Sequence, residues 1–282
     1  MAYKDLLLAL ASYPEPASVA AIDQAVGIVG LLGARISAVT FELQIPKPVS
    51  FYTDAVLDIS GMIAEAQQKS LANAQGLLNA FETAATRHSV FQENLLERCL
   101  PGEAADILVE HARLRDLTLI PVRDGDSIEQ WYAETVIFGS GRPTLVLPEA
   151  SRRGGAPTID TVAIAWDFSR PAARAVADAL PLLERAMRVR VVTVVNEKDI
   201  ASRRSSAEIA RHLARHDIEI VLDEFDSEGR GIGEALEAYV ASHNADLLVM
   251  GAYGHSRVRE FILGGATRSM LARPPVPVFL SH

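Results

Sequence analysis

Short apolar runs alternate with amphipathic segments along the whole chain. In the second half the apolar runs are rich in Val, Ile and Leu and lack strict alternation, which is typical of strands buried on both faces of a parallel sheet. The segments between them have helical periodicity, so the pattern predicts a doubly wound α/β sheet. The predicted strands are 160–166, 189–195, 218–223, 246–251 and 276–281, and the predicted helices are about 171–186, 203–215, 233–243 and 264–272.

The same succession of blocks is written twice. Asp5–Leu10 resembles Thr161–Trp166, and Asp116–Ile120 resembles Asp246–Met250. A polar Gly/Pro segment, 149–157, separates the two copies and is typical of a linker. The repeat therefore predicts two domains, 1–149 and 158–282, each with a five-stranded, mostly parallel sheet flanked by helices.

Composition limits the class of protein. The chain has 282 residues, of which 49% are hydrophobic and 22% are charged, and this balance excludes a disordered chain. A single cysteine, Cys99, excludes an intramolecular disulfide and a cysteine-cluster metal site, and it fits the reducing cytoplasm. The most apolar stretch, 19–41, carries polar residues and predicts a buried helix that leads into a strand. We therefore expect a cytoplasmic protein with no membrane partner.

Charge is unevenly distributed between the halves. Residues 1–150 contain 10 basic and 19 acidic residues, whereas residues 151–282 contain 17 of each. An anion would therefore bind more easily in the second half. The pI of about 5.3 argues against a nucleic-acid partner, because nothing in the chain would neutralise a run of phosphates.

A glycine-rich segment follows the fourth strand of the second half. After Met250 it reads Gly, two residues, Gly, nine residues, Gly-Gly and two further small residues. Glycines there leave backbone N–H groups accessible, and a helix that opens on small residues presents free donors to an anion. Tight turns alone would explain isolated glycines, but the spacing favours a binding site. The candidate residues of this segment are Met250, Gly251, Gly254, His255, Gly264, Gly265, Ala266 and Thr267.

Two other strand ends carry weaker signals. Ala165, Trp166 and Asp167 follow the first strand of the second half, and a carboxylate there could accept hydrogen bonds from a ribose or a base amino group. Capping of the next helix by Asp167 or Ser169 is an alternative that is compatible with this role. Trp166 could lie near an adenine, although core packing is the more common role of such a residue. Val195 ends the second strand, where its backbone could meet a base edge.

These motifs together resemble the universal stress protein family. The second half resembles the nucleotide-binding type, and the whole chain resembles the tandem, two-domain members. The resemblance implies ATP binding, with or without Mg²⁺, in which Asp167 and the backbone near Val195 hold the adenosine. The glycine-rich segment, with Ala266 and Thr267, would hold ribose and phosphates, and His255 could reach a phosphate. It also implies that the two halves pair through their last strands as a pseudo-dimer, and that chains associate further into a homo-oligomer.

The first half departs from this pattern at each matching point. Pro121 matches Gly251, Asp124 matches Gly254, and Ala11 matches Asp167; Ala133–Glu134 lies near the match of Gly264–Gly265. Proline offers no N–H, and nearby carboxylates would repel a phosphate by about 1 kcal/mol or more for each close pair. We therefore expect no ATP in the first half, which would serve in dimerisation or hold an uncharged ligand.

Three functions remain open at this level. The first is a stress-response regulatory protein whose nucleotide changes a surface read by an unidentified protein partner. The second is a nucleotide-independent interaction module. The third is a weak ATPase, with at most slow hydrolysis, because the chain has no Gly-Lys-[Ser/Thr] phosphate loop and no evident acid–base pair. The sequence predicts no catalytic residues and no protein-ligated metal.

Overall fold

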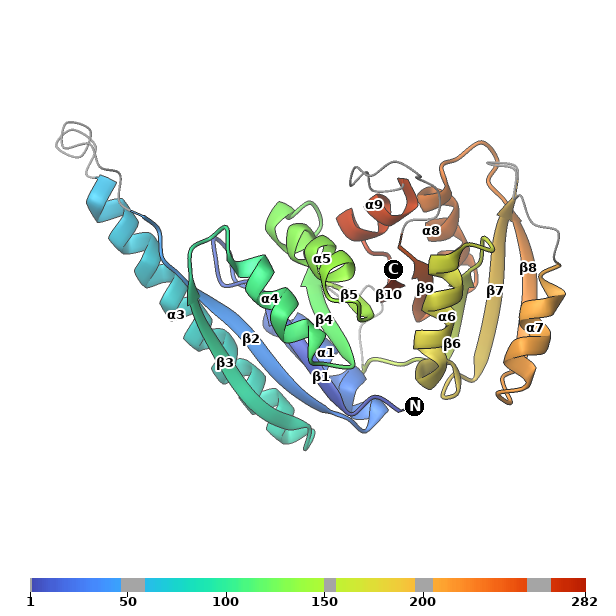
Figure 1. Ribbon diagram of the computed structural model, residues 1–282, viewed down its shortest axis with the longest axis horizontal. Coiled ribbons are helices and arrows are strands. Elements are labelled where there is room, and N and C mark those ends of the chain that lie inside the picture. Colours follow the sequence, from blue (N-terminus) through green and yellow to red (C-terminus); the bar gives the residue numbers. More distant parts are fainter. Residues whose placement is uncertain (1, 47–58, 150–155, 196–204, 253–264) are drawn as a thin grey trace.

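One continuous ten-stranded sheet runs through the molecule (Figure 1). The computed structural model describes residues 2–46, 59–149, 156–195, 205–252 and 265–282. The strand order is β3-β2-β1-β4-β5-β10-β9-β6-β7-β8, so each half contributes five adjacent strands. All neighbours are parallel except β5 and β10, which pair antiparallel at the centre. The doubly wound α/β fold and the pseudo-dimeric packing predicted from the sequence are confirmed.

Elements of the two halves follow each other in the same order. In the first half they are β1 Asp5–Leu10, α1 Val19–Leu32, β2 Arg35–Leu43, α3 Ile59–Arg87, β3 Phe91–Cys99, α4 Ala104–Arg113, β4 Leu117–Val122, α5 Ser127–Gly139 and β5 Thr144–Pro148. In the second half they are β6 Thr161–Ala165, α6 Arg170–Leu183, β7 Arg188–Val195, α7 Ala207–Ala214, β8 Ile220–Asp226, α8 Ile232–Ser242, β9 Leu247–Gly251, α9 Gly265–Ala272 and β10 Val278–Ser281. The strands predicted for the second half are all present, with ends that differ by at most three residues.

Helices cover both faces of the sheet and bury two separate cores. On one face α1, α3, α6 and α7 pack on alternate strand residues such as Leu8 and Ile164. On the other face α4, α5, α8 and α9 pack on the intervening residues, such as Leu7 and Ala163. The strands are therefore buried on both sides, which explains their continuous apolar runs. Figure 1 shows α3 reaching beyond the sheet at the end of the first half.

Strand registers make the two halves comparable residue by residue. Leu6 faces Leu117 across β1 and β4, and Val162 faces Leu247 across β6 and β9. At the start of the neighbouring strand, the Lys4 N–H donates to Asp116 in the first half and the Thr161 N–H donates to Asp246 in the second, each at 2.8 Å. Counting along the strands from these matched pairs makes Pro121 equivalent to Gly251 and Ala11 equivalent to Asp167, as the sequence predicts.

Contacts on both faces hold the two halves together. Between α1 and α6, the Arg185 guanidinium donates to the carbonyls of Leu31 and Leu32 at 2.8 and 3.2 Å. On the opposite face, the Gly125 N–H donates to the Ala272 carbonyl at 3.2 Å. The join therefore combines a sheet with polar contacts on either side of it. The domain boundaries 1–149 and 158–282 stay a prediction.

Candidate functional site

The strand order reverses direction between β6 and β9 in the second half. From β6 the chain proceeds to β7 and β8 on one side, and then returns to β9 and β10 on the other. In sheets of this kind, ligands bind beyond the carboxyl ends of the strands at such a switch point. The equivalent point of the first half lies between β1 and β4. We refer to these two places as the second and the first crevice.

Asp167 lies at the second crevice, directly after β6. Its Oδ1 accepts the Ser169 N–H at 2.9 Å, and Ser169 in turn caps α6 by accepting the Ala172 N–H at 3.2 Å. Phe168 between them has a positive φ of 61°, which turns the chain sharply from strand to helix. The capping alternative raised by the sequence is therefore confirmed for Ser169. The turn that contains Asp167 is held firmly in place at the strand end.

Trp166 packs against the core that α6 and α7 cover, with its ring 5.6 Å from the Phe168 ring. Its backbone N–H donates to the Val192 carbonyl at 2.9 Å. The indole Nε1 is buried and has no hydrogen-bond partner among the described residues. Packing in the core therefore accounts for most of the Trp166 side chain, which is the more common role of a tryptophan at a strand end.

Val195 is the last residue of β7, and β7 extends past the end of β6. The β6–β7 register ends at Ala165 and Val192, so the final residues of β7 have no β6 partner on that edge. On the β8 edge, the Val195 carbonyl accepts the Ser227 N–H at 3.1 Å. Among the described strands, β6 therefore offers no partner to this edge of β7 beyond Ala165.

Gly251 ends β9, where the backbone of α6 approaches closely. A Cβ on Gly251 would lie 2.4 Å from the Ala172 nitrogen and 2.5 Å from the Pro171 carbonyl carbon. Contact between the strand end and the helix start therefore requires glycine here. From the sequence, the expected reason for this glycine is the approach of a ligand. Its contact with the backbone of α6 is a second reason, within the protein itself.

The first described residue of α9 is Gly265, which is exposed, and a Cβ on it would meet no atom of the described residues within 4 Å. Ala266 is half-buried against the core. Thr267 is 2% exposed and belongs to the packed face of α9, so it lies away from the exposed face where Gly265 lies. Met250 is likewise a core residue, 5% exposed. The remaining candidates, Gly254, His255 and Gly264, lie outside the described residues.

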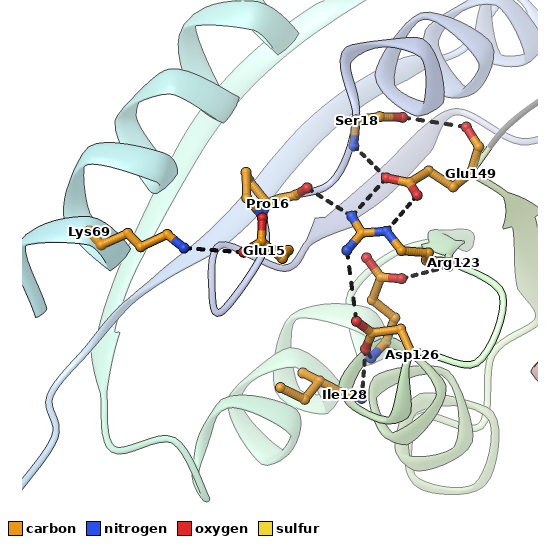
Figure 2. A network of polar contacts seen from close by, with 9 residues as sticks. Glu15, Pro16, Ser18, Lys69, Arg123, Asp126, Ile128 and Glu149 are labelled. Atoms are coloured by element: carbon orange, nitrogen blue, oxygen red, sulfur yellow. Dashed lines mark hydrogen bonds and ion pairs between the residues drawn. The ribbon is translucent and has the colours of Figure 1, made fainter. Parts of the chain in front are cut away.

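A cluster of charged side chains occupies the first crevice (Figure 2). The Arg123 guanidinium donates to both carboxylate oxygens of Glu149 at 2.7 and 2.9 Å, and to the Pro16 carbonyl at 3.0 Å. The same Glu149 carboxylate accepts the Ser18 N–H at 3.0 Å, next to the start of α1. Arg123 thus joins the ends of β4 and β5 to the loop that follows β1. This pairing holds the pKa of Glu149 below its ordinary value.

Glu129 lies beneath this cluster and is only 3% exposed. Its carboxylate accepts the backbone N–H of Arg123 at 2.6 Å. Burial raises its pKa to about 7, with smaller contributions from the neighbouring Asp126 and Glu149 carboxylates. Asp126 caps α5 by accepting the N–H groups of Ile128 and Glu129 at 2.8 and 3.0 Å. The carboxylates of Asp126 and Glu129 are therefore occupied by hydrogen bonds within the protein itself.

Glu134 lies in the middle of α5, and counting from Leu117 and Leu247 makes it equivalent to Gly264, which lies outside the described residues. Burial raises the pKa of Glu134, and the charge of Arg268 on α9 of the other half acts against this shift. A carboxylate in the place of a phosphate stays a prediction here. Asp124 and Asp126 remain at the crevice.

Sequence reasoning missed Arg123 and Glu149 as partners. From the sequence, Glu149 is interpreted only as the start of the linker, and Arg123 has no assigned role. Both follow directly after a strand, β4 and β5, and adjacent parallel strands bring such residues together. The position after the strand was therefore the available signal. Within the ranges that the structure describes, no group of three His, Cys, Asp or Glu residues is arranged to hold a metal ion.

The fold defines a doubly wound α/β protein built from two similar halves, and comparisons show which known proteins it resembles. Residues 158–282 match the model of the Universal stress protein family. The chain is 42% identical over 45 residues to "Universal stress protein Slr1230" of Synechocystis, a match that covers 16% of either protein. The second half of the chain is therefore similar to the universal stress protein family.

Solved structures extend this likeness to the whole chain as a fold. A universal stress protein from Archaeoglobus fulgidus superimposes with a TM-score of 0.70 at 17% identity, covering 98% of this chain and 95% of that one. A protein described as a putative universal stress protein from Pseudomonas aeruginosa gives a TM-score of 0.55 at 12% identity, covering 99% and 93%. The resemblance to tandem universal stress proteins is thus confirmed. Among the described residues, no helix is both long and apolar enough to cross a membrane.

Proposed function

We propose that the second crevice binds ATP or another adenine nucleotide, and that the first crevice does not. The observation that carries this proposal is the contrast between the two crevices on one strand framework. The first crevice contains the Arg123–Glu149 pair and buried Glu129. The described part of the second crevice carries Asp167, the end of β7 that extends past β6, and the exposed Gly265 of α9.

Each part of the second crevice suits one part of a nucleotide. The Asp167 carboxylate would accept hydrogen bonds from a ribose hydroxyl or an adenine amino group, and the backbone near Val195 would meet a base edge. The N–H groups and the positive dipole end at Gly265 and Ala266 suit phosphate oxygens. Gly251, Gly254, His255 and Gly264 would complete the phosphate end, with Mg²⁺ held by the phosphates themselves.

The first half has a different role in this proposal. A phosphate entering it would displace Glu149 from Arg123 and approach Asp126, so like charges oppose its binding. We assign this half to the assembly of the molecule, and its own ligand, if it has one, would be uncharged. Because β5 and β10 already pair with each other, further association of chains into a homo-oligomer would use surfaces other than these strands.

We infer a regulatory role in the cytoplasm, in which nucleotide occupancy changes a surface that a protein partner reads. Slow hydrolysis is the most that we expect, because phosphoryl transfer needs a positioned base or water and a cationic clamp on the γ-phosphate. A nucleotide-independent interaction module is the alternative. Failure of the purified protein to bind ATP, ADP or AMP would favour that alternative.

The test of the site is the variant Asp167→Asn, which keeps an oxygen for the Ser169 N–H and removes the charge. We expect ATP to bind about tenfold more weakly in calorimetry, equivalent to about 1.4 kcal/mol, because a hydrogen bond to a charged acceptor is lost. The control is Asp23→Asn on α1, with the same change of charge far from the crevice. Equal affinity of all three proteins would remove Asp167 from the site.

A further inference from the structure

The short helix α9 touches both halves of the molecule. Its first residue, Gly265, belongs to the candidate nucleotide site of the second half. At its other end, the Ala272 carbonyl accepts the Gly125 N–H at 3.2 Å, and the Arg273 Nε lies 3.4 Å from an Asp124 carboxylate oxygen. Eight helical residues span about 12 Å, so a single rigid element connects the two places.

The loop on the first half is itself held firmly. Gly125 has a positive φ of 78°, a conformation that favours glycine and that directs its N–H toward α9. On one side of it, Arg123 is bound to Glu149 and Pro16, and on the other side Asp126 caps α5. The loop therefore offers a fixed support to the end of α9.

The flank of α9 is fixed as well. A Cβ on Gly233 of α8 would lie 2.5 Å from the Ser269 Cβ, so these two helices are in close contact. Arg268 also acts electrostatically on Glu134 of α5. The helix is thus held between α8 of its own half and α5 and the Asp124–Gly125 loop of the other.

We propose that Asp124 and Gly125 of the first half are positioning residues for the nucleotide site of the second half, acting through α9. This inference rests on the proposed nucleotide binding. Phosphate contacts at Gly265 need this end of α9 in one place, and the loop fixes the other end of the same helix. The first half would then hold the neighbouring site in shape while binding no nucleotide itself.

The test measures ATP affinity by calorimetry in the full chain. Asp124→Asn and Arg273→Gln should each weaken binding about two- to fivefold, the range expected when an exposed ion pair is lost. The double variant should be no weaker than either single one, and the charge exchange Asp124→Arg with Arg273→Asp should restore affinity. Glu15→Gln, which breaks the exposed Glu15–Lys69 pair at 3.2 Å in the same half, is the matched control.

Hydrogen exchange supplies a second readout in the native chain. Bound ATP should slow exchange of the Gly125 amide at least threefold, and leave the amides of β3 unchanged. If wild-type protein binds ATP but the Asp124 and Arg273 variants bind it equally well, with no change at Gly125, the positioning role is wrong. If wild-type protein binds no nucleotide, the proposed function itself fails.

Discussion

Single side chains make the two crevices different. Arg123 brings a cation to the end of β4 and is satisfied by Glu149 and Pro16, so its charge is neutralised inside the protein. The matched strand of the second half ends in Gly251, whose lack of a side chain lets α6 approach. A shared strand framework thus supports an internal ion pair at one end of the molecule and a candidate ligand site at the other.

Glu129 gives a prediction about pH. Its pKa of about 7 in the folded protein lies above the ordinary carboxyl value of about 4.3, so protonation favours the folded state. This stabilisation is complete below the ordinary value and is lost as the pH rises through about 7. We expect the free energy of unfolding by urea to fall by about 1–3 kcal/mol between pH 5 and pH 8 through this group.

The variant Glu129→Gln isolates that contribution. Glutamine keeps an oxygen for the Arg123 N–H but does not titrate, so the stability of the variant should depend less on pH over this range. Glu149, whose pKa is lowered, contributes in the opposite direction and only at more acidic pH. An identical pH dependence in wild type and variant would show that Glu129 is not the group responsible.

Glycines at the element ends separate packing from binding. At Gly251 an added Cβ meets the backbone of α6, which has little freedom to move, whereas at Gly265 it meets nothing within 4 Å. Gly251→Ala should therefore destabilise the protein by about 2 kcal/mol or more in urea unfolding. Gly265→Ala is the matched variant, and we expect it to be neutral or up to about 1 kcal/mol more stable. Equal stability of the two variants would contradict the close contact.

Most elements were predictable because their apolar runs are long and are separated by capping and turn residues. Ser169 and Pro171 mark the start of α6, and Gly231 directly precedes α8. The 29-residue helix α3 was not predicted, because the repeat offers no helix of that length among the described residues of the second half. The Arg123–Glu149 pair depends on strands that only the fold brings together.

The whole molecule joins its halves in three layers. Pairing of β5 with β10 makes one sheet, Arg185 connects α6 to α1 on one face, and Gly125 and Asp124 connect to α9 on the other. Contacts in every layer favour cooperative behaviour of the two halves. We therefore expect the molecule to unfold in one transition.

The chain offers a direct probe of this cooperativity, since its two tryptophans fall in different halves. Trp131 lies on α5 and Trp166 follows β6. In Trp166→Phe, fluorescence reports the first half alone, and in Trp131→Phe it reports the second. Urea midpoints from the two variants, each compared with circular dichroism of the same sample, should coincide. Two separate transitions within one variant would show that the halves unfold independently.

The central claim is that one chain holds one adenine nucleotide, in the second half. The most direct test is to denature freshly purified protein with acid, and to identify and count the released nucleotide by chromatography and mass spectrometry. Protein that is empty as purified is first loaded with ATP and Mg²⁺ and passed through a desalting column. We expect close to one nucleotide per chain. Two nucleotides per chain would contradict the claim that the charged side chains of the first crevice exclude a nucleotide. No nucleotide after loading would contradict the proposed site in the second crevice.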